Sequence, residues 1–395
     1  MSSKEGNSGT MDVDFDSSWL EKATLAAPAD LRPLYERFKQ LHEKKLWFQL
    51  TQAVEQYMAH PSSSTPTLRL DLYQKFISTF ATKINRLRLV ALAVIASKQF
   101  GEPASALTFL ENLATSIDTD DSQEAFVFAT MEAAHFKLIL GDVEGTKEAM
   151  DKCAKILDSF NTVERGVHAS FYRVSGDYHK TKAEYASYYK NSLLYLACVD
   201  LDVDLTEEDR IQRARDLALS ALLGDTIYNF GELLLHPILT SLQSSPYSWL
   251  STLLFSFNSG DIGKFESLLP HLQSEPILSE NQAFLRQKIC LMALIESVFR
   301  RASTDRTLPF ETIAVETRLP LDEVEHLVMK ALSLKLIKGS LDQHAQLAKI
   351  TWVQPRVLDK PQLNALQQRL NAWVGRVEEV AQFVKGQTPE LFITA

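Results

Sequence analysis

The stretch PFETIAVETRLPLDEVEHLVMKALSLKLIKGSLD, which runs from Pro309 to Asp342, decides the fold. Its first half holds two segments with apolar residues at helical spacing, separated by the Arg-Leu-Pro turn that ends at Pro320. Proline suits the first turn of a helix, because an N–H there would have no intrahelical partner. After Leu334 the pattern changes to two short apolar runs, LIKGSL and AKITWV, joined by the polar DQHAQL. Two helices around a turn and two strands predict a winged-helix module over residues 310–358.

The charge of this stretch decides whether the module binds nucleic acid. A DNA-reading second helix presents its first residues to base edges and phosphates, and here these are Asp322, Glu323 and Glu325. Residues 310–342 carry six acidic against four basic side chains, and the whole chain has a net charge of −9. Phosphate binding requires a positive surface, so we expect a contact with protein through the wing and not with DNA or RNA. The wing residues predicted to take part are Leu336, Ile337, Leu341, Ile350 and Trp352.

Helical periodicity fills residues 19–299 and indicates a repeat architecture. Turn signals, each a glycine followed by an aspartate, recur at Gly141, Gly176, Gly224 and Gly260, at intervals of 35, 48 and 36 residues. Glycine ends a helix in the left-handed conformation, and aspartate caps the next helix. Two of the intervals lie close to the ~34-residue period of stacked helical hairpins. The sequence therefore predicts an α-solenoid, and an irregular helical domain with coincidental turns is the alternative.

The segments on either side of the predicted solenoid have no apolar period. Residues 1–18 are polar and acidic, which predicts a disordered tail. Residues 300–309, RRASTDRTLP, are polar and end in a proline, which predicts a linker. Ser303 follows two arginines in this linker, a pattern typical of kinase targets, and is a candidate phosphorylation site.

A C-terminal helix is predicted over residues 361–385. Its apolar residues alternate at steps of three and four, which is the spacing of a heptad seam. Two structures fit this pattern equally well: a helix that packs among helices of other chains, or a helix folded back on its own winged-helix module. The seam residues are Leu363, Leu366, Leu370, Trp373, Val377, Val380 and Val384.

Motifs of catalysis do not occur in the sequence. There is no His-x-His or His-Glu-x-x-His metal spacing, no nucleophile elbow and no P-loop, so no catalytic, cofactor or metal residue is predicted. Three widely spaced cysteines fit a reducing compartment. No apolar run approaches the ~20 residues of a membrane span, so we expect a soluble protein that is not an enzyme. Four tyrosines at helical spacing are expected to belong to the core: Tyr185, Tyr188, Tyr189 and Tyr195.

The layout of solenoid, winged helix and trailing helix resembles PCI-domain proteins, and six segments resemble PCI subunits of the proteasome lid more specifically. They fall in order and cover most of the chain from about residue 35. The segments are KKLWFQLT (44–51), ASYYKNSLLYLACVD (186–200), NFGELLLHPIL (229–239), FNSGDIGKFE (257–266), VEHLVMKALSLKLIKGSLD (324–342) and TWVQPRVLD (351–359).

This resemblance implies a mainly α, non-catalytic scaffold subunit that supports ubiquitin-dependent degradation in cytoplasm and nucleus. It implies a hetero-oligomer in which winged helices pair edge to edge and C-terminal helices gather in a bundle. The implied partners are other PCI subunits of the lid, the lid deubiquitinase heterodimer and the ubiquitin receptor, with no cofactor, nucleic acid or membrane. Alternatives are a PCI scaffold of the COP9 signalosome or of a translation initiation factor complex, and a winged-helix protein that binds nucleic acid.

Overall fold

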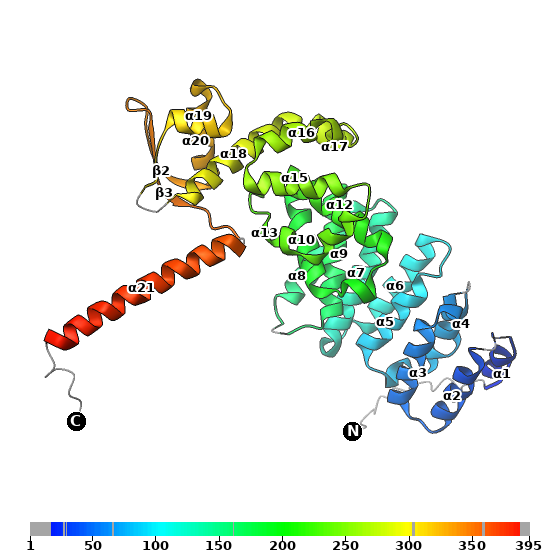
Figure 1. The fold of residues 1–395 in the computed structure, drawn as a ribbon. Helices are drawn as coiled ribbons and strands as arrows, with labels where there is room; N and C mark the ends of the chain where they lie inside the picture. The colour runs from blue at the N-terminus through cyan, green and yellow to red at the C-terminus, as the bar shows by residue number, and fades with distance from the viewer. Residues whose placement is uncertain are drawn as a thin grey trace, which may run out of the picture. The chain divides into compact units, whose positions relative to one another are not determined.

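The computed structural model describes residues 17–26, 28, 30–64, 67–160, 162–301, 305–357 and 360–387. Ser303 lies outside these ranges, as does the predicted tail except for its last two residues, which begin the first helix. The chain divides into unit 1, Met1–Asp204, and unit 2, Leu205–Ala395. Helices dominate both units, which confirms the mainly α fold predicted from the sequence (Figure 1).

Unit 1 is built of consecutive helices that pack on one another as hairpins, for example α6 on α7 and α9 on α10. Short 3₁₀ segments occur at Pro61–Ser64, Ile77–Lys83 and Asp120–Ser122. The helices are α1 (Ser17–Ala26), α2 (Arg32–Glu43), α3 (Trp47–Ala59), α4 (Leu68–Lys75), α5 (Arg86–Ser97), α6 (Pro103–Ile117), α7 (Gln123–Ile139), α8 (Val143–Leu157), α9 (Arg165–Thr181), α10 (Tyr185–Cys198) and α11 (Leu201–Asp204).

The turn between α7 and α8 has the predicted glycine-aspartate structure. Gly141 has a φ of +88°, and the Asp142 carboxylate accepts the N–H of Gly145 at 2.9 Å as the cap of α8. The turn predicted at Gly176 is wrong, because this residue is buried inside α9. A Cβ there would lie at an ordinary contact distance, 3.6 Å, from the Ser192 Oγ of α10, so this glycine faces α10 from the middle of a helix and does not end one.

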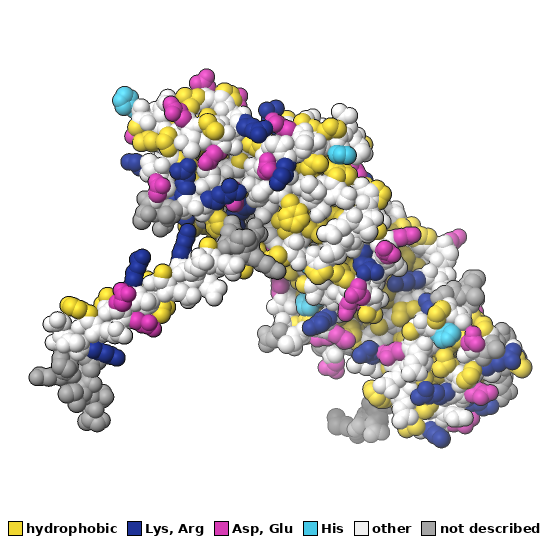
Figure 2. All heavy atoms as spheres, viewed as in Figure 1, with side chains coloured by type: hydrophobic (Ala, Val, Ile, Leu, Met, Phe, Trp, Pro, Cys, Tyr) yellow, Lys and Arg dark blue, Asp and Glu magenta, His cyan; other side chains and the backbone are white. Residues whose placement is uncertain are grey.

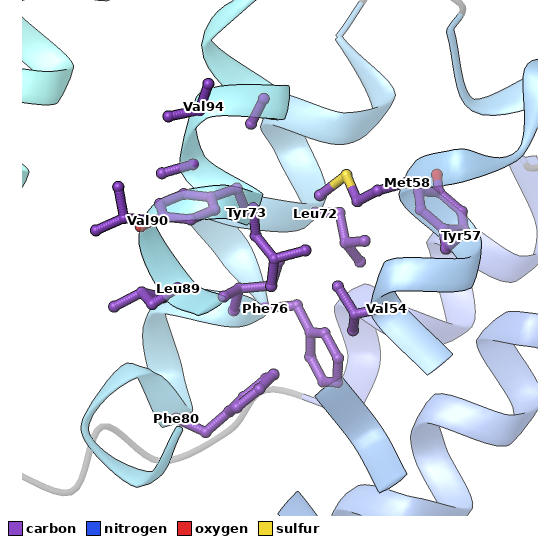
Figure 3. Close-up of a cluster of buried hydrophobic side chains, with 14 of the residues drawn as sticks. Val54, Tyr57, Met58, Leu72, Tyr73, Phe76, Phe80, Leu89, Val90 and Val94 are labelled. Carbon is purple, nitrogen blue, oxygen red and sulfur yellow. The ribbon is translucent and has the colours of Figure 1, made fainter. Parts of the chain in front are cut away.

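The core of unit 1 is rich in aromatic rings. Phe76 and Phe80 have ring centroids 5.0 Å apart, and the hydroxyls of Tyr35 and Tyr57 hydrogen-bond at 2.7 Å. Tyr188, Tyr189 and Tyr195 are buried and Tyr185 is half-buried, as expected for core residues. Side chains of α3, α4 and α5 meet around these rings (Figure 3), among them Val54, Met58, Leu72, Tyr73, Leu89, Val90 and Val94.

Unit 2 continues with helices and then changes to a small module with a sheet. A 3₁₀ segment lies at Pro237–Leu239. The elements are α12 (Glu207–Leu223), α13 (Gly231–Leu235), α14 (Thr240–Gln243), α15 (Ser248–Ser259), α16 (Ile262–Leu272), α17 (Pro276–Glu280), α18 (Gln282–Arg300), β1 (Thr307–Pro309), α19 (Phe310–Thr317), α20 (Leu321–Ser333), β2 (Ile337–Asp342), β3 (Leu347–Val353) and α21 (Lys360–Gln387).

The turn between α15 and α16 also has the predicted structure. Gly260 has a φ of +68°, and Asp261 caps α16 by accepting the N–H of Lys264 at 3.1 Å. At Gly224 the helix end is different, because its φ is −61°. A buried lysine takes part there instead.

Lys288 of α18 holds the end of α12 and is only 1% exposed. Its Nζ donates to the carbonyl oxygens of Ala221, Leu222 and Gly224 at 2.8, 3.0 and 2.6 Å. Ala221 and Leu222 belong to the last turn of α12, whose carbonyls lack an intrahelical partner, and Gly224, which follows that turn, also accepts the N–H of Ile227 at 3.4 Å. Burial lowers the pKa of Lys288 to about 7, while the carboxylate of Asp225 acts in the opposite direction.

The module after α18 is a winged helix, as predicted. Its sheet has the order β1-β3-β2, and both neighbours pair antiparallel with β3. Strand β1 was not predicted from the sequence. It lies in the segment predicted as a linker and pairs with β3, with Leu308 opposite Ala348. Leu308 is fully buried, but a three-residue strand with one buried side chain has no alternation to reveal it.

Candidate functional site

The five wing residues predicted to contact a partner divide between core and surface. Leu336, Ile337 and Ile350 are 3%, 1% and 5% exposed, so their side chains build the core of the module itself. Apolar residues in short strands have this role more often than an outward one, and the prediction of side-chain contacts is corrected for these three. Leu341 is half-buried and Trp352 is 37% exposed, so these two side chains reach the surface.

One strand of the sheet has a free edge long enough for a further strand. Strand β3 has no free edge, because it is the central strand and has β2 on one side and β1 on the other. Among the described residues β2 has no neighbour beyond it, so its backbone is the edge at which another chain can add. A bulge between Lys338 and Gly339 interrupts this edge, and a Cβ on Gly339 would lie 2.1 Å from the Lys349 oxygen.

Apolar side chains of the module are exposed on its sheet and on both of its helices. Trp352 lies opposite Lys338 in the register, and the Lys338 Nζ lies 5.0 Å from the centre of the indole ring. Val315 of α19 and Met329 of α20 are 79% and 47% exposed. Sequence analysis missed both, although each lies off the buried stripe of its helix, which is the signal that could have found them.

The charges at the start of α20 agree with the sequence argument. Asp322 and Glu323 are exposed in its first turn, where they complement the positive end of the helix dipole. A phosphate that approached this end would meet two carboxylates.

The apolar seam of α21 lies on the surface. Its seven residues span an arc of about 100° around the helix at 3.6 residues per turn. Val374 and Phe383, which the heptad pattern had left out, are also exposed. Apolar side chains are visible along this helix in Figure 2. The exposed fractions are 49% for Leu363, 43% for Leu366, 53% for Leu370, 63% for Trp373, 47% for Val377, 62% for Val380 and 42% for Val384.

The described cysteines are not activated as nucleophiles. Burial raises the pKa of all three thiols, Cys153 to about 12, together with Cys198 and Cys290, whereas a reactive cysteine needs a lowered pKa. Within the described ranges no three His, Cys, Asp or Glu side chains come together as a metal site. The helices described there include none with the length and apolarity to cross a membrane.

A helical-repeat region followed by a winged helix with an open sheet edge and a long amphipathic helix defines a PCI-domain protein. The family model described as PCI domain matches residues 267–351, and the model described as PSD13 N-terminal repeats matches residues 34–254. The second match covers more than half of the chain.

Curated relatives specify the family. The chain is 40% identical over 380 residues to 26S proteasome non-ATPase regulatory subunit 13 homolog B of Arabidopsis thaliana, covering 94% of this chain and 98% of the relative. It is 39% identical over 386 residues to 26S proteasome regulatory subunit RPN9 of Saccharomyces cerevisiae, covering 94% and 97%. The chain therefore belongs to the family of 26S proteasome non-ATPase regulatory subunit 13. Eukaryotic translation initiation factor 3 subunit M of Neosartorya fischeri is similar over less of the chain, with 28% identity over 44% of it.

Proposed function

We propose that this chain is a non-catalytic structural subunit of the lid of the 26S proteasome regulatory particle and supports ubiquitin-dependent degradation there. The observation that carries the proposal is α21, a 28-residue helix with an exposed apolar seam. Val374 and Phe383, which lie off the heptad positions, are exposed as well, so the apolar face is wider than the stripe of a two-stranded coiled coil and suits a helix with several neighbours. Names of relatives at about 40% identity support the choice of complex.

Two surfaces would make the contacts. The edge of β2 would pair with the sheet of another PCI subunit through backbone hydrogen bonds, with Leu341 and Trp352 beside it. The seam of α21 would join a bundle with helices of other lid subunits. We infer further neighbours in the lid deubiquitinase heterodimer and, through the outer solenoid, in the ubiquitin receptor. The subunit would act in cytoplasm and nucleus.

Charged substitutions in the seam test this function. Full burial of a Leu, Val or Trp side chain contributes about 1.5–3 kcal/mol, and these three are about half exposed on the helix, so Leu370→Glu, Trp373→Glu and Val377→Glu together remove at least ~2 kcal/mol of association energy. At 1.4 kcal/mol per factor of ten, incorporation should fall more than tenfold. The measurement is the share of tagged subunit in intact lid on a native gel, with partners identified by affinity purification and mass spectrometry.

The control carries the same added charge on the opposite side of α21. Gln368, Asn371 and Gln382 are exposed and lie away from the seam, so their replacement by Glu should leave incorporation unchanged. Normal incorporation of the seam variant would contradict the role of α21. Recovery of signalosome or initiation-factor subunits in place of proteasome subunits would keep the fold and overturn the proposed complex.

A further inference from the structure

The chain between the winged helix and α21 is attached to the body of unit 2 at several points. We call residues 354–357 the strap. At its start, the N–H of Gln354 donates to the Leu336 oxygen at 2.8 Å and so prolongs the pairing of the sheet. At its end, Val357 lies against Gly231, the first residue of α13, where a Cβ would come within 2.2 Å of the Val357 Cβ.

Arg356 is the central attachment of the strap, and its side chain is 5% exposed. Its Nη1 donates to Glu296 Oε2 of α18 at 2.5 Å. Its Nη2 donates to the backbone oxygen and to the Oδ1 of Asn258 in α15, at 2.5 and 2.9 Å. Glu296 in turn accepts from Arg300 through its other oxygen at 3.0 Å. A buried guanidinium with a carboxylate and two further acceptors is a strong, directional attachment.

The strap limits how far α21 can move from the body. Helix α21 begins at Lys360, three residues after Val357. At ~3.6 Å per extended residue, its first residue stays within about 11 Å of the attached Val357. If the strap detached back to Val353, the tether would grow to seven residues and about 25 Å. The volume open to the start of α21 would then rise about twelvefold, and its effective concentration near a fixed partner would fall by the same factor.

We propose that Arg356 is a positioning residue for assembly, which fixes the root of α21 so that its seam meets the partner helices in one place. This inference rests on the proposed function of α21. Arg356 itself contacts no partner in this role. It acts through the strap, and residues on α13, α15 and α18 hold that strap.

The first test measures hydrogen exchange of residues 354–357 in the isolated full chain, where no lid is needed. Arg356→Ala should speed exchange at Gln354 about tenfold or more, while α12 and α18 keep their protection. Arg300→Ala is the matched control, because it removes a partner of the same Glu296 carboxylate but leaves the strap in place, and its side chain is 66% exposed. Unchanged exchange at Gln354 in Arg356→Ala would overturn the proposal whatever the lid does.

The second test measures incorporation into the lid in competition with wild type. Arg356→Ala should be incorporated about tenfold less well, in line with the lower effective concentration. Gly231→Ala should act in the same direction through steric displacement of Val357, and Val357→Gly added to it should restore incorporation. Eight Gly and Ser residues inserted between Leu358 and Asp359 should reproduce the loss with Arg356 intact.

The two tests separate this proposal from the proposed function. If the seam variant of α21 assembles normally, the proposed function fails. The seam variant could be excluded from the lid while Arg356→Ala and the insertion variant are incorporated like wild type. In that case α21 contacts its partners without a fixed starting point, and the positioning role of Arg356 is refuted.

Discussion

Replacement of Lys288 by Met gives a test of how unit 2 is held together. In the wild-type protein, the hydrogen bonds of the Lys288 amine stabilise the fold, and the burial of its charge destabilises it. The side chain donates to three carbonyls, of which that of Gly224 also accepts the N–H of Ile227. A buried acceptor without a donor costs about 1–3 kcal/mol, so loss of the donor to Ala221 and Leu222 costs about 2–6 kcal/mol. In the other direction, burial of the amine lowers its pKa to about 7 from an unfolded value near 10.4, which costs about 4–5 kcal/mol at neutral pH. The two nearly cancel at pH 7, and we expect the variant to lie within about 2 kcal/mol of wild type there.

The sign of the pH dependence follows from the lowered pKa. Between pH 7 and about 10 the unfolded chain keeps a proton on this amine that the folded chain has lost. The free energy of unfolding of wild type therefore rises by up to ~1.4 kcal/mol per pH unit in this window, and the Met variant lacks this contribution. Between pH 7 and 9 the difference between wild type and variant should grow by about 2 kcal/mol in favour of wild type, because the folded amine is already half deprotonated at pH 7.

Two cysteines report the two units separately in one sample. Cys290 is buried in α18 of unit 2, and Cys153 is buried in unit 1. Alkylation of each thiol as a function of urea, read by mass spectrometry at pH 7, 8 and 9, gives the midpoint at which its unit opens. The substitution should change the Cys290 curve and leave the Cys153 curve in place. Lys264→Met, at a lysine whose side chain is 67% exposed, is the control and should change neither.

Parallel pH curves for wild type and Lys288→Met would refute the reasoning. If the variant were less stable than wild type by the same amount at all three pH values, the Lys288 ammonium would stay charged in the fold and its three hydrogen bonds would outweigh its desolvation. A variant more stable than wild type at pH 9 would mean that the carbonyls find other donors.

Two further predictions concern the turn between α15 and α16; the first uses the same Cys290 readout, and the second is read by urea unfolding followed by circular dichroism, because alkylation needs the thiolate. Gly260→Ala combines a left-handed φ with a Cβ only 2.6 Å from the Ala293 Cα, so unit 2 should lose about 2–5 kcal/mol, whereas Gly375→Ala on exposed α21 should cost nothing. Asp261→Ala removes a helix cap and should cost about 1 kcal/mol at pH 7. Because the Lys264 N–H lowers the pKa of Asp261, this difference should be present above pH 4 and vanish as pH falls through the folded pKa; a difference that persists at pH 2 would contradict the cap.

Local signals predicted the parts of the fold that local physics decides. A glycine before an aspartate predicts a left-handed residue that ends one helix and a cap that begins the next, and the structure has this arrangement at Gly141 and Gly260. At Gly176 the same two residues occur inside α9, where the glycine is buried and faces α10. Local propensity thus allows several backbone conformations at a glycine, and tertiary packing selects among them.

The attachments that matter most in unit 2 had no signal at all. Lys288 reaches carbonyls 64 to 67 residues away in sequence, and Arg356 reaches a partner 98 residues away. A buried basic residue is uncommon enough that composition argues against it, so neither was expected from the sequence. Only contacts between distant elements reveal such groups, since no periodicity or spacing encodes them.

The two surfaces of the proposed site differ in what they can recognise. An edge strand offers backbone groups that any extended chain can pair with, so β2 supplies binding energy with little selectivity, and its bulge shortens the stretch that can pair. Three of the apolar wing residues are buried and cannot add selectivity. In the proposed assembly, the choice among related PCI subunits would therefore come from exposed side chains, Trp352 beside the edge and the seam of α21. The seam can contact only partner helices that lie near the start of α21. The position of that start would therefore contribute to recognition, and the strap would act on specificity as well as on affinity.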